Sequence, residues 1–368
     1  MTPLDLDDTA AVLAADRAGV LAGLATAAAQ VREGATLTDA AALRPLQEDG
    51  RPRTLLVVAV EGDGADAARL VAAAAAPGAV PVLRLVAPTP PPGSVGPLDL
   101  VLVLAPSGDE PALLALLPEL ARRGARLAAV TPAPSPVADL VARARGVLLE
   151  LPRARAAQPP GTVLWALVAP ALLACAGVGA GSTDAAALEA AAVALEVVAA
   201  RCRPDAEAVT NPAKTLAREL GGPLVLLAAP GAEPGTALAV ARAARRLAVE
   251  AGVACLADAG DLERLRGVLT VTGEPAEPAL ADPLEALFRD RAEDDELPAA
   301  PPVVLLEPEP STAGDALRGW AADRGAVLLP LAVEPTGLLA RAATAVALLD
   351  AAVAYRVLAA RAAYPTAA

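Results

Sequence analysis

Two short glycine-containing turns carry the side chains best placed to do chemistry. One contains Gly62 and Gly64 among several carboxylates, and the other runs from Ser107 to Glu110. Each turn follows an apolar run and precedes a helical stretch, so its polar groups lie at a helix N-terminus, where backbone N–H groups attract anions. In the second turn Asp109 and Glu110 can supply that anion themselves. The turn is therefore either a ligand site or a pair of acids that cap their own helix, and we favour the caps.

The composition excludes several classes of catalytic site. The 368 residues include no histidine, which rules out Ser-His-Asp, Cys-His and HExxH sites. Proton transfer is left to carboxylates, Cys, Tyr, Lys or water. Lys214 is the only lysine, so no Walker-type lysine accompanies a glycine loop and Schiff-base chemistry has little scope. The net charge of −13 repels nucleic-acid phosphate, and we expect no nucleic-acid partner, no cofactor and no metal.

Cysteine usage and the N-terminal sequence indicate a reduced, cytoplasmic protein. Cys175, Cys202 and Cys255 are widely separated, odd in number and form no CxxC pair, which is typical of buried thiols. The acidic N-terminus lacks the basic region of a signal peptide. The run 162–181 is long enough to span a bilayer, but its small residues and the internal Pro170 favour a buried helix. We therefore expect no membrane partner.

The elements that must position the two turns form a pattern that occurs twice. Residues 5–32 are expected to form one leading helix. Five apolar runs then alternate with helical stretches, which is typical of a parallel sheet covered on both faces. The expected strands are 54–60, 80–86, 98–105, 125–131 and 146–151, and the expected helices are 65–76, 111–123 and 136–145.

The pattern breaks at a helical region of about 161–201 and then restarts. The expected strands are 223–229, 251–256, 265–272, 302–307 and 326–333, and the expected helices are 236–248, 283–289, 313–324 and 337–362. We therefore predict two tandem α/β domains, each a five-stranded parallel sheet flanked by helices. The predicted division is an N-terminal helix (1–34), a first domain (35–160), a helical connector (161–203), a second domain (204–335) and a C-terminal helix (336–368).

Several motifs in these two domains resemble those of SIS (sugar isomerase) domains. The turn Ser107–Glu110 is similar to the family's S-x-S-G-N-T turn, which holds phosphate, and 122–131 is similar to the helix end and strand that follow it. Residues 150–160 resemble a segment of bifunctional phosphoglucose/phosphomannose isomerases that carries an active-site arginine. Residues 204–217 resemble the N-P-A-K-x-L-A stretch that opens the second domain. The match spans roughly residues 35–365, rests on order and spacing, and suits a divergent bacterial member encoded by a GC-rich genome.

The resemblance also assigns residues to roles and shows where this chain departs from the family. The family's first glycine turn, of G-x-G-G-S-G type, falls at 60–66, where Gly62 and Gly64 remain and the hydroxyl is lost. The glutamate base of the family falls at Asp258, one methylene shorter. Its active-site arginine falls at Arg155, with Arg153 as the alternative. The histidine region holds no imidazole, and the family's C-terminal lysine has no counterpart.

From this pattern we expect a flavodoxin-like, homodimeric SIS-fold protein with a degenerate active site, which binds a sugar derivative or a partner without isomerase turnover. One alternative is an active aldose–ketose isomerase that converts glucose or mannose 6-phosphate to fructose 6-phosphate with a carboxylate base. The other is a structural or regulatory protein-interaction module. The expected catalytic residues are Asp258 and Arg155. The expected residues for a sugar or sugar-phosphate ligand are Gly62, Gly64, Ser107, Gly108, Asp109 and Glu110.

Overall fold

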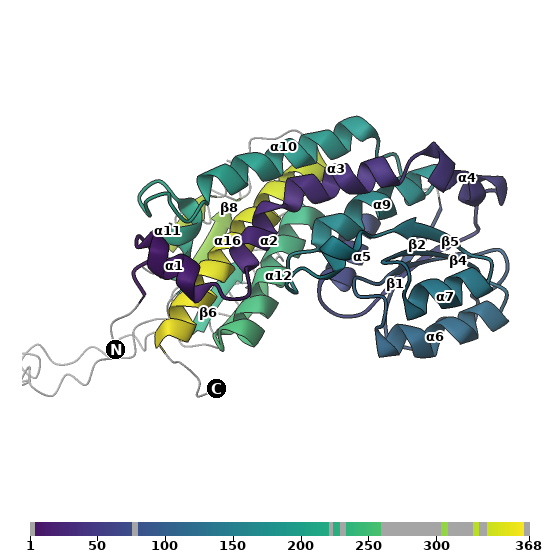
Figure 1. The fold of residues 1–368 in the computed structure, drawn as a ribbon, viewed down its shortest axis with the longest axis horizontal. Helices are drawn as coiled ribbons and strands as arrows, with labels where there is room; N and C mark the ends of the chain where they lie inside the picture. The colour runs from purple at the N-terminus through teal and green to yellow at the C-terminus, as the bar shows by residue number, and fades with distance from the viewer. Residues whose placement is uncertain are drawn as a thin grey trace, which may run out of the picture.

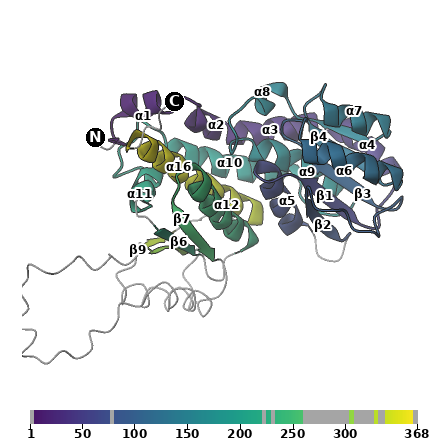
Figure 2. The ribbon, with the colours of Figure 1, turned by 90° about the horizontal axis from the view of Figure 1, so that it is seen from below.

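Two parallel β-sheets and the long helices between them make up the computed structural model of the chain (Figure 1). It describes residues 4–75, 80–220, 224–228, 233–258, 303–307, 327–330 and 337–363. The first sheet lies at one end of the molecule. The second lies beside α12 (Pro234–Glu250) and α16 (Leu338–Ala363), as Figure 2 shows from below.

The first sheet has five parallel strands in the order β2-β1-β3-β4-β5. Neighbouring strands β1 and β3 are buried along their whole length and pair from Leu55↔Leu100 to Ala59↔Leu104. The strand order reverses between these two strands, so their following loops diverge and leave a crevice at the carboxyl edge. The strands are β1 (Leu55–Ala59), β2 (Val82–Val86), β3 (Leu100–Leu104), β4 (Arg126–Thr131) and β5 (Val147–Glu150).

Helices cover both faces of this sheet, as the apolar strands predict. Alternate residues of a strand point to opposite faces. Leu55, Val57 and Ala59 of β1 join the core beneath α5 (Asp63–Ala74) and α9 (Leu164–Gly177). Leu56 and Val58 join a second core beneath α6 (Pro111–Arg122) and α7 (Pro136–Arg143). The short helices α4 (Ala40–Glu48) and α8 (Arg153–Ala156) lie at the margins.

The single leading helix expected over residues 5–32 is wrong: this stretch belongs to three helices. They are α1 (Thr9–Ala15), α2 (Val20–Ala25) and α3 (Ala27–Leu37). The first break comes at Gly19, which has φ of +71°, a conformation open to glycine. The Asp16 carboxylate then accepts hydrogen bonds from the N–H groups of Val20 (2.8 Å) and Leu21 (2.9 Å), which starts a new helix.

The described strands of the second sheet are also parallel and have the order β7-β6-β8-β9. The same reversal of strand order therefore occurs in both halves. The expected strand 265–272 and the expected helices 283–289 and 313–324 lie outside the described residues. The strands are β6 (Leu224–Ala228), β7 (Ala254–Asp258), β8 (Val303–Glu307) and β9 (Val327–Pro330).

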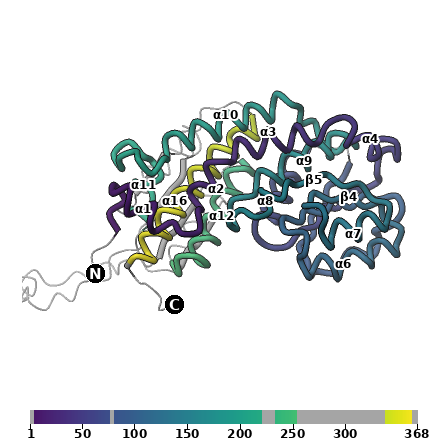
Figure 3. The backbone as a smooth tube through the Cα atoms, viewed as in Figure 1, coloured from purple at the N-terminus to yellow at the C-terminus, as the bar shows by residue number. Residues whose placement is uncertain are grey.

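A layer of long helices joins the halves. α16 packs against α10 (Ala185–Arg201), α11 (Pro212–Glu219) and α12, and α3 runs alongside α10, as the tube in Figure 3 shows. Within the described residues, α16 is long and apolar enough to cross a membrane, but 78% of its most apolar window is buried inside the protein. Residues 164–172 of α9 are all buried as well, which agrees with the interpretation of run 162–181 as a core helix.

A fully buried glutamine fixes the start of α9. Gln30 of α3 donates to the Thr162 carbonyl at 2.6 Å and to Gln158 Oε1 at 3.0 Å, while its own Oε1 accepts from Ala166 N at 3.1 Å. The N–H groups of a first helical turn have no partner inside the helix, so this side chain satisfies one of them. Gln30 therefore ties the N-terminal helices to the first domain.

We predict that Gln30→Leu lowers the free energy of unfolding by about 2–4 kcal/mol, because buried polar groups of α9 lose their partner. Chemical denaturation followed by circular dichroism measures the change. Gln47→Leu on the exposed side of α4 is the matched control and should stay within about 0.5 kcal/mol of the wild type. A Gln30→Leu protein as stable as this control would contradict the prediction.

Candidate functional site

A cleft of about 480 Å³ opens at the carboxyl edge of the first sheet, where the strand order reverses. The turns after β1 and β3 form one side. Residues 156–163 and the arginine-bearing face of α12 form the other. Pockets at this position are the usual ligand sites of open parallel sheets, and a volume of about 300–1,000 Å³ is typical of them. The cleft is therefore the candidate functional site.

The glycines of the two turns set the backbone of the cleft. Gly62 has φ of +99° and precedes α5. A Cβ on Gly64 would lie 3.2 Å from the Leu104 carbonyl, so glycine lets α5 approach β3 closely. Gly108 has φ of +78°, and a Cβ there would lie 2.5 Å from Ser135 Oγ. Gly62 lines the cleft, whereas Gly64 and Gly108 are buried beneath it and act through packing.

Asp63 is the first residue of α5 and follows the turn that contains Gly62. Its carboxylate is nearly buried and lies in the first turn of α5. Oδ2 accepts hydrogen bonds from the N–H groups of Gly161 (2.9 Å) and Val163 (3.2 Å). Oδ1 lies 2.8 Å from Nη1 of Arg242. The Asp63 carboxylate therefore binds both the backbone just before α9 and an arginine of α12.

Glu110 likewise places a carboxylate of the chain against the backbone of the second turn. Its Oε1 accepts a hydrogen bond from Ser107 N at 2.8 Å, and the residue is only 7% exposed. Ser107 and Glu110 line the cleft, while the exposed Asp109 is not among the lining residues. Glu110 stands at the N-cap position of α6 but makes no capping bond to that helix. The expected caps are therefore wrong in detail, because the Glu110 carboxylate binds the turn instead.

Arg242 on α12 is the centre of a buried ion cluster that crosses the cleft floor. Its side chain is 1% exposed. Nη1 lies 2.7 Å from Asp66 Oδ2, Nε lies 3.0 Å from both oxygens of Asp350, and Nη2 donates to the Gly161 carbonyl at 2.7 Å. With Asp63, these contacts join α5, α12, α16 and the segment before α9. Arg242 therefore connects the two halves of the protein.

Three more arginines complete the cluster. Arg246 pairs with Asp350 at 2.9 Å and with Glu250 at 2.7 Å. Arg245 and Arg69 both pair with Asp66, the latter at 2.8 Å. The cluster therefore matches four arginines with four carboxylates, namely Asp63, Asp66, Glu250 and Asp350.

The cluster shifts the pKa values of Asp66 and Arg242 in favour of their charged forms. Burial alone would raise the pKa of Asp66, but Arg242 and Arg245 outweigh it and hold that pKa below the ordinary aspartate value. Burial would lower the pKa of Arg242, but Asp350, Asp63 and Asp66 together raise it well above its ordinary value. Both groups are therefore charged at neutral pH.

Of the two residues expected to be catalytic, only Arg155 has a described side chain. Arg155 lies on α8, is not among the lining residues, and its Nε lies 2.6 Å from Glu33 Oε2 on α3. Its alternative, Arg153, binds the carbonyls of Ala133 and Pro134. In this structure Arg155 therefore pairs with Glu33 outside the cleft lining, and its expected catalytic role stays a prediction. Asp258 ends β7, and its side chain lies outside what the structure describes.

Lys214, Cys175 and Cys202 are buried, and their surroundings are structural. Lys214 is 1% exposed, and its Nζ donates to the carbonyls of Pro204 (2.8 Å) and Ala206 (2.7 Å). Asn211, from the same N-P-A-K stretch, caps α11 through the N–H groups of Ala213 and Lys214. Burial raises the pKa of Cys175 to about 12 and that of Cys202 to about 11, so neither forms a thiolate at neutral pH.

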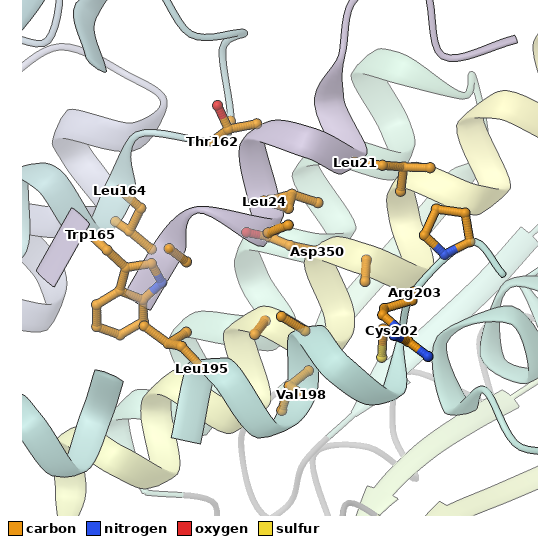
Figure 4. A pocket seen from close by; sticks show the side chains of 17 residues that line it. Leu21, Leu24, Thr162, Leu164, Trp165, Leu195, Val198, Cys202, Arg203 and Asp350 are labelled. Atoms are coloured by element: carbon orange, nitrogen blue, oxygen red, sulfur yellow. The ribbon is translucent and has the colours of Figure 1, made fainter. Parts of the chain in front are cut away.

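A smaller, mostly apolar cavity of about 80 Å³ is bordered by Asp350 of the ion cluster (Figure 4). It is too small for a substrate pocket and is enclosed by helices on several sides. Asp350 reaches its wall from α16, so the same carboxylate serves the cluster and borders this void. Its labelled lining residues are Leu21, Leu24, Thr162, Leu164, Trp165, Leu195, Val198, Cys202, Arg203 and Asp350.

Sequence analysis missed the arginines of α12 and the role of Asp350. Two features of the sequence point to these residues. Arg242, Arg245 and Arg246 share one face of a helix at spacings of three and four residues, and Asp350 is the one acidic residue of the long apolar helix α16. Arg242 and Asp350 are 108 positions apart, so no local motif joins them.

Comparison with known proteins supports the fold and leaves the family open. No protein-family model matches the chain, and no curated protein matches its sequence. Solved structures do match. A protein of Clostridium difficile 630, provisionally described as a phosphosugar isomerase, is 8% identical with a TM-score of 0.64 and covers 95% of both chains.

Two further structures have the same arrangement. The C-terminal domain of glucosamine-fructose-6-phosphate aminotransferase from Francisella tularensis is 12% identical, with a TM-score of 0.61 over 94% of this chain and 96% of its own. A protein of Silicibacter pomeroyi DSS-3, also provisionally described as a phosphosugar isomerase, is 17% identical, with a TM-score of 0.59 over 94% and 98%. Identities this low show the fold alone. The chain thus has the fold of SIS-type phosphosugar isomerases, and the narrower resemblance to phosphoglucose/phosphomannose isomerases stays a prediction.

We predict that Arg242→Met lowers the free energy of unfolding by about 3–5 kcal/mol, because it leaves buried carboxylates without their cation. Urea denaturation measures this loss. Arg44→Met removes an exposed pair with Glu48 and should cost no more than about 1 kcal/mol. Equal effects of the two substitutions would show that the cluster does not hold the halves together.

Acid should weaken the same cluster. The folded-state pKa of Asp66 is lowered, so its contribution is complete above the unfolded-state pKa of about 3.9 and is lost as the pH falls through the folded-state value. We predict that Asp66→Asn is less stable than the wild type at pH 7 and loses less stability on acidification below pH of about 4. Unfolding curves at several pH values test this, with the exposed Asp49→Asn as control.

Proposed function

We propose that the protein binds a sugar derivative in the cleft between β1 and β3 without isomerising a sugar phosphate. The observation that carries this proposal is the position of the Asp63 carboxylate. It holds the N–H groups of Gly161 and Val163 and faces Arg242, so the groups that would bind a phosphate already bind an acid of the chain.

The chemistry of isomerisation supports the same conclusion. The reaction needs a phosphate anchor, a base that moves a proton between C1 and C2, and a group that opens the ring. Glu110 occupies the second phosphate anchor, because its carboxylate accepts a hydrogen bond from Ser107 N. A phosphate placed beside it would be repelled, since two like charges at about 4 Å repel by about 4 kcal/mol at an effective dielectric of about 20. No imidazole exists for ring opening, and Glu33 holds Arg155. A cytoplasmic homodimer remains part of the proposal.

We predict no conversion of fructose 6-phosphate to glucose or mannose 6-phosphate in a coupled assay with the full chain. Turnover abolished by Asp258→Ala but retained in Asp261→Ala would overturn the proposal and favour an isomerase with a carboxylate base. Millimolar sugar phosphate should also leave the melting temperature unchanged. Capture of a partner protein with no sugar-dependent change in melting temperature would favour an interaction module instead.

A substitution at Asp63 tests directly whether its carboxylate fills the position of a phosphate. We predict that Asp63→Ser is destabilised, because Arg242 loses one of its carboxylates, and that inorganic phosphate or sulfate restores part of the melting temperature. The wild type should not respond to either anion, since Asp63 fills the site. Asp39→Ser, at an exposed N-cap of α4, is the matched control and should show no anion rescue. Anion stabilisation of the wild type would contradict the proposed occupancy.

A further inference from the structure

The wall of the cleft that α12 forms carries several charged side chains, but these are already paired within the protein. Arg242 and Arg246 are only 1% and 5% exposed, and both belong to the ion cluster. Arg246 also pairs with Glu250, and Arg245 pairs with the buried Asp66. An ionic ligand would have to displace one of these partners, and a buried charge that loses its partner is costly. The α12 wall therefore offers a ligand little charge that is not already neutralised.

Apolar side chains form the accessible part of the same wall. Val249 lies three residues after Arg246 on α12 and is 79% exposed. Of the large apolar side chains that the structure describes as exposed, it alone lines the cleft. Pro160 also lines the cleft and is exposed, and Pro106 of the facing turn is half-buried there. A ligand that covers these groups gains free energy, because apolar surface is removed from water.

The other side of the cleft is polar where the turns of the first sheet reach it. Glu61 and Ser107 follow β1 and β3, line the cleft and are exposed. A carboxylate accepts hydrogen bonds and a hydroxyl group both donates and accepts them, which suits the hydroxyl groups of a sugar. The cleft thus combines a polar side with an apolar wall.

The size of the cleft agrees with a ligand larger than a bare monosaccharide. Its volume of about 480 Å³ falls within the range of about 300–1,000 Å³ that holds drug-sized ligands, which are larger than one sugar ring. A sugar ring bound at the polar side therefore leaves space toward α12 for a further group on the same ligand.

We infer that the cleft recognises an uncharged sugar derivative with an apolar substituent, whose hydroxyl groups face Glu61 and Ser107 and whose substituent packs against Val249. This inference rests on the proposed function and names the ligand class of the same site. It assigns the selection of the substituent to the α12 wall and the binding of the sugar to the two turns. A phenyl glycoside is a simple probe of this class.

Calorimetric titration of the full chain with the phenyl and methyl glycosides of glucose and mannose tests the inference. We expect at least one phenyl glycoside to bind at least about tenfold more tightly than its methyl counterpart, because the ring buries more apolar surface. Val249→Ser should lower the affinity for that phenyl glycoside at least about threefold and change the affinity for the methyl glycoside less than about twofold. Val193→Ser, at an exposed valine of α10 outside the cleft lining, is the matched control and should bind both as the wild type does.

Equal affinity for the phenyl and methyl glycosides in the wild type would overturn the inference and leave the proposed function standing. Absence of binding by all four glycosides, or an unchanged preference in Val249→Ser, would overturn the inference as well. Both valines are exposed, so neither substitution should change the melting temperature, and a loss of affinity cannot be attributed to unfolding. Isomerase turnover of fructose 6-phosphate would instead overturn the proposed function, whatever the result with these glycosides.

Discussion

A guanidinium group that cannot lose its proton and cannot reach water is the constraint on which this structure depends. Arg242 is charged at any physiological pH, so its burial requires carboxylates from several directions. Asp63 and Asp66 come from α5, Asp350 comes from α16, and the Gly161 carbonyl comes from the segment before α9. The relative positions of these elements follow from satisfying one cation.

The same constraint determines what the cleft can bind. A helix N-terminus next to buried arginines would ordinarily attract a phosphate. Here Asp63 pairs with Arg242 and accepts hydrogen bonds from the N–H groups of Gly161 and Val163, so these groups are already engaged by the chain. At the neighbouring turn the Glu110 carboxylate accepts a hydrogen bond from Ser107 N in the same way. The chain therefore combines the fold of SIS-type phosphosugar isomerases with a cleft whose turns bind carboxylates of the chain itself.

The sequence predicted the fold better than the site, for physical reasons. Strands such as β1 and β3 are continuous apolar runs bounded by turns, so local pattern is enough to find them. The break at Gly19 was missed because the helical pattern continues across it. Of the expected site residues, Gly62, Ser107 and Glu110 line the cleft, whereas Arg155 does not line it and pairs with Glu33, 122 positions away. Arg242 and Asp350 meet only after two halves have folded together, and no spacing along the chain encodes that contact.

The internal carboxylate at Asp63 also has a consequence for how the two halves assemble. A bound ligand contributes to holding a site together only while it is present. Asp63 is part of the chain, so its contacts with Arg242 and with the N–H groups of Gly161 and Val163 form as the protein folds. The junction between the halves is therefore complete without any metabolite, and its strength does not follow the supply of one.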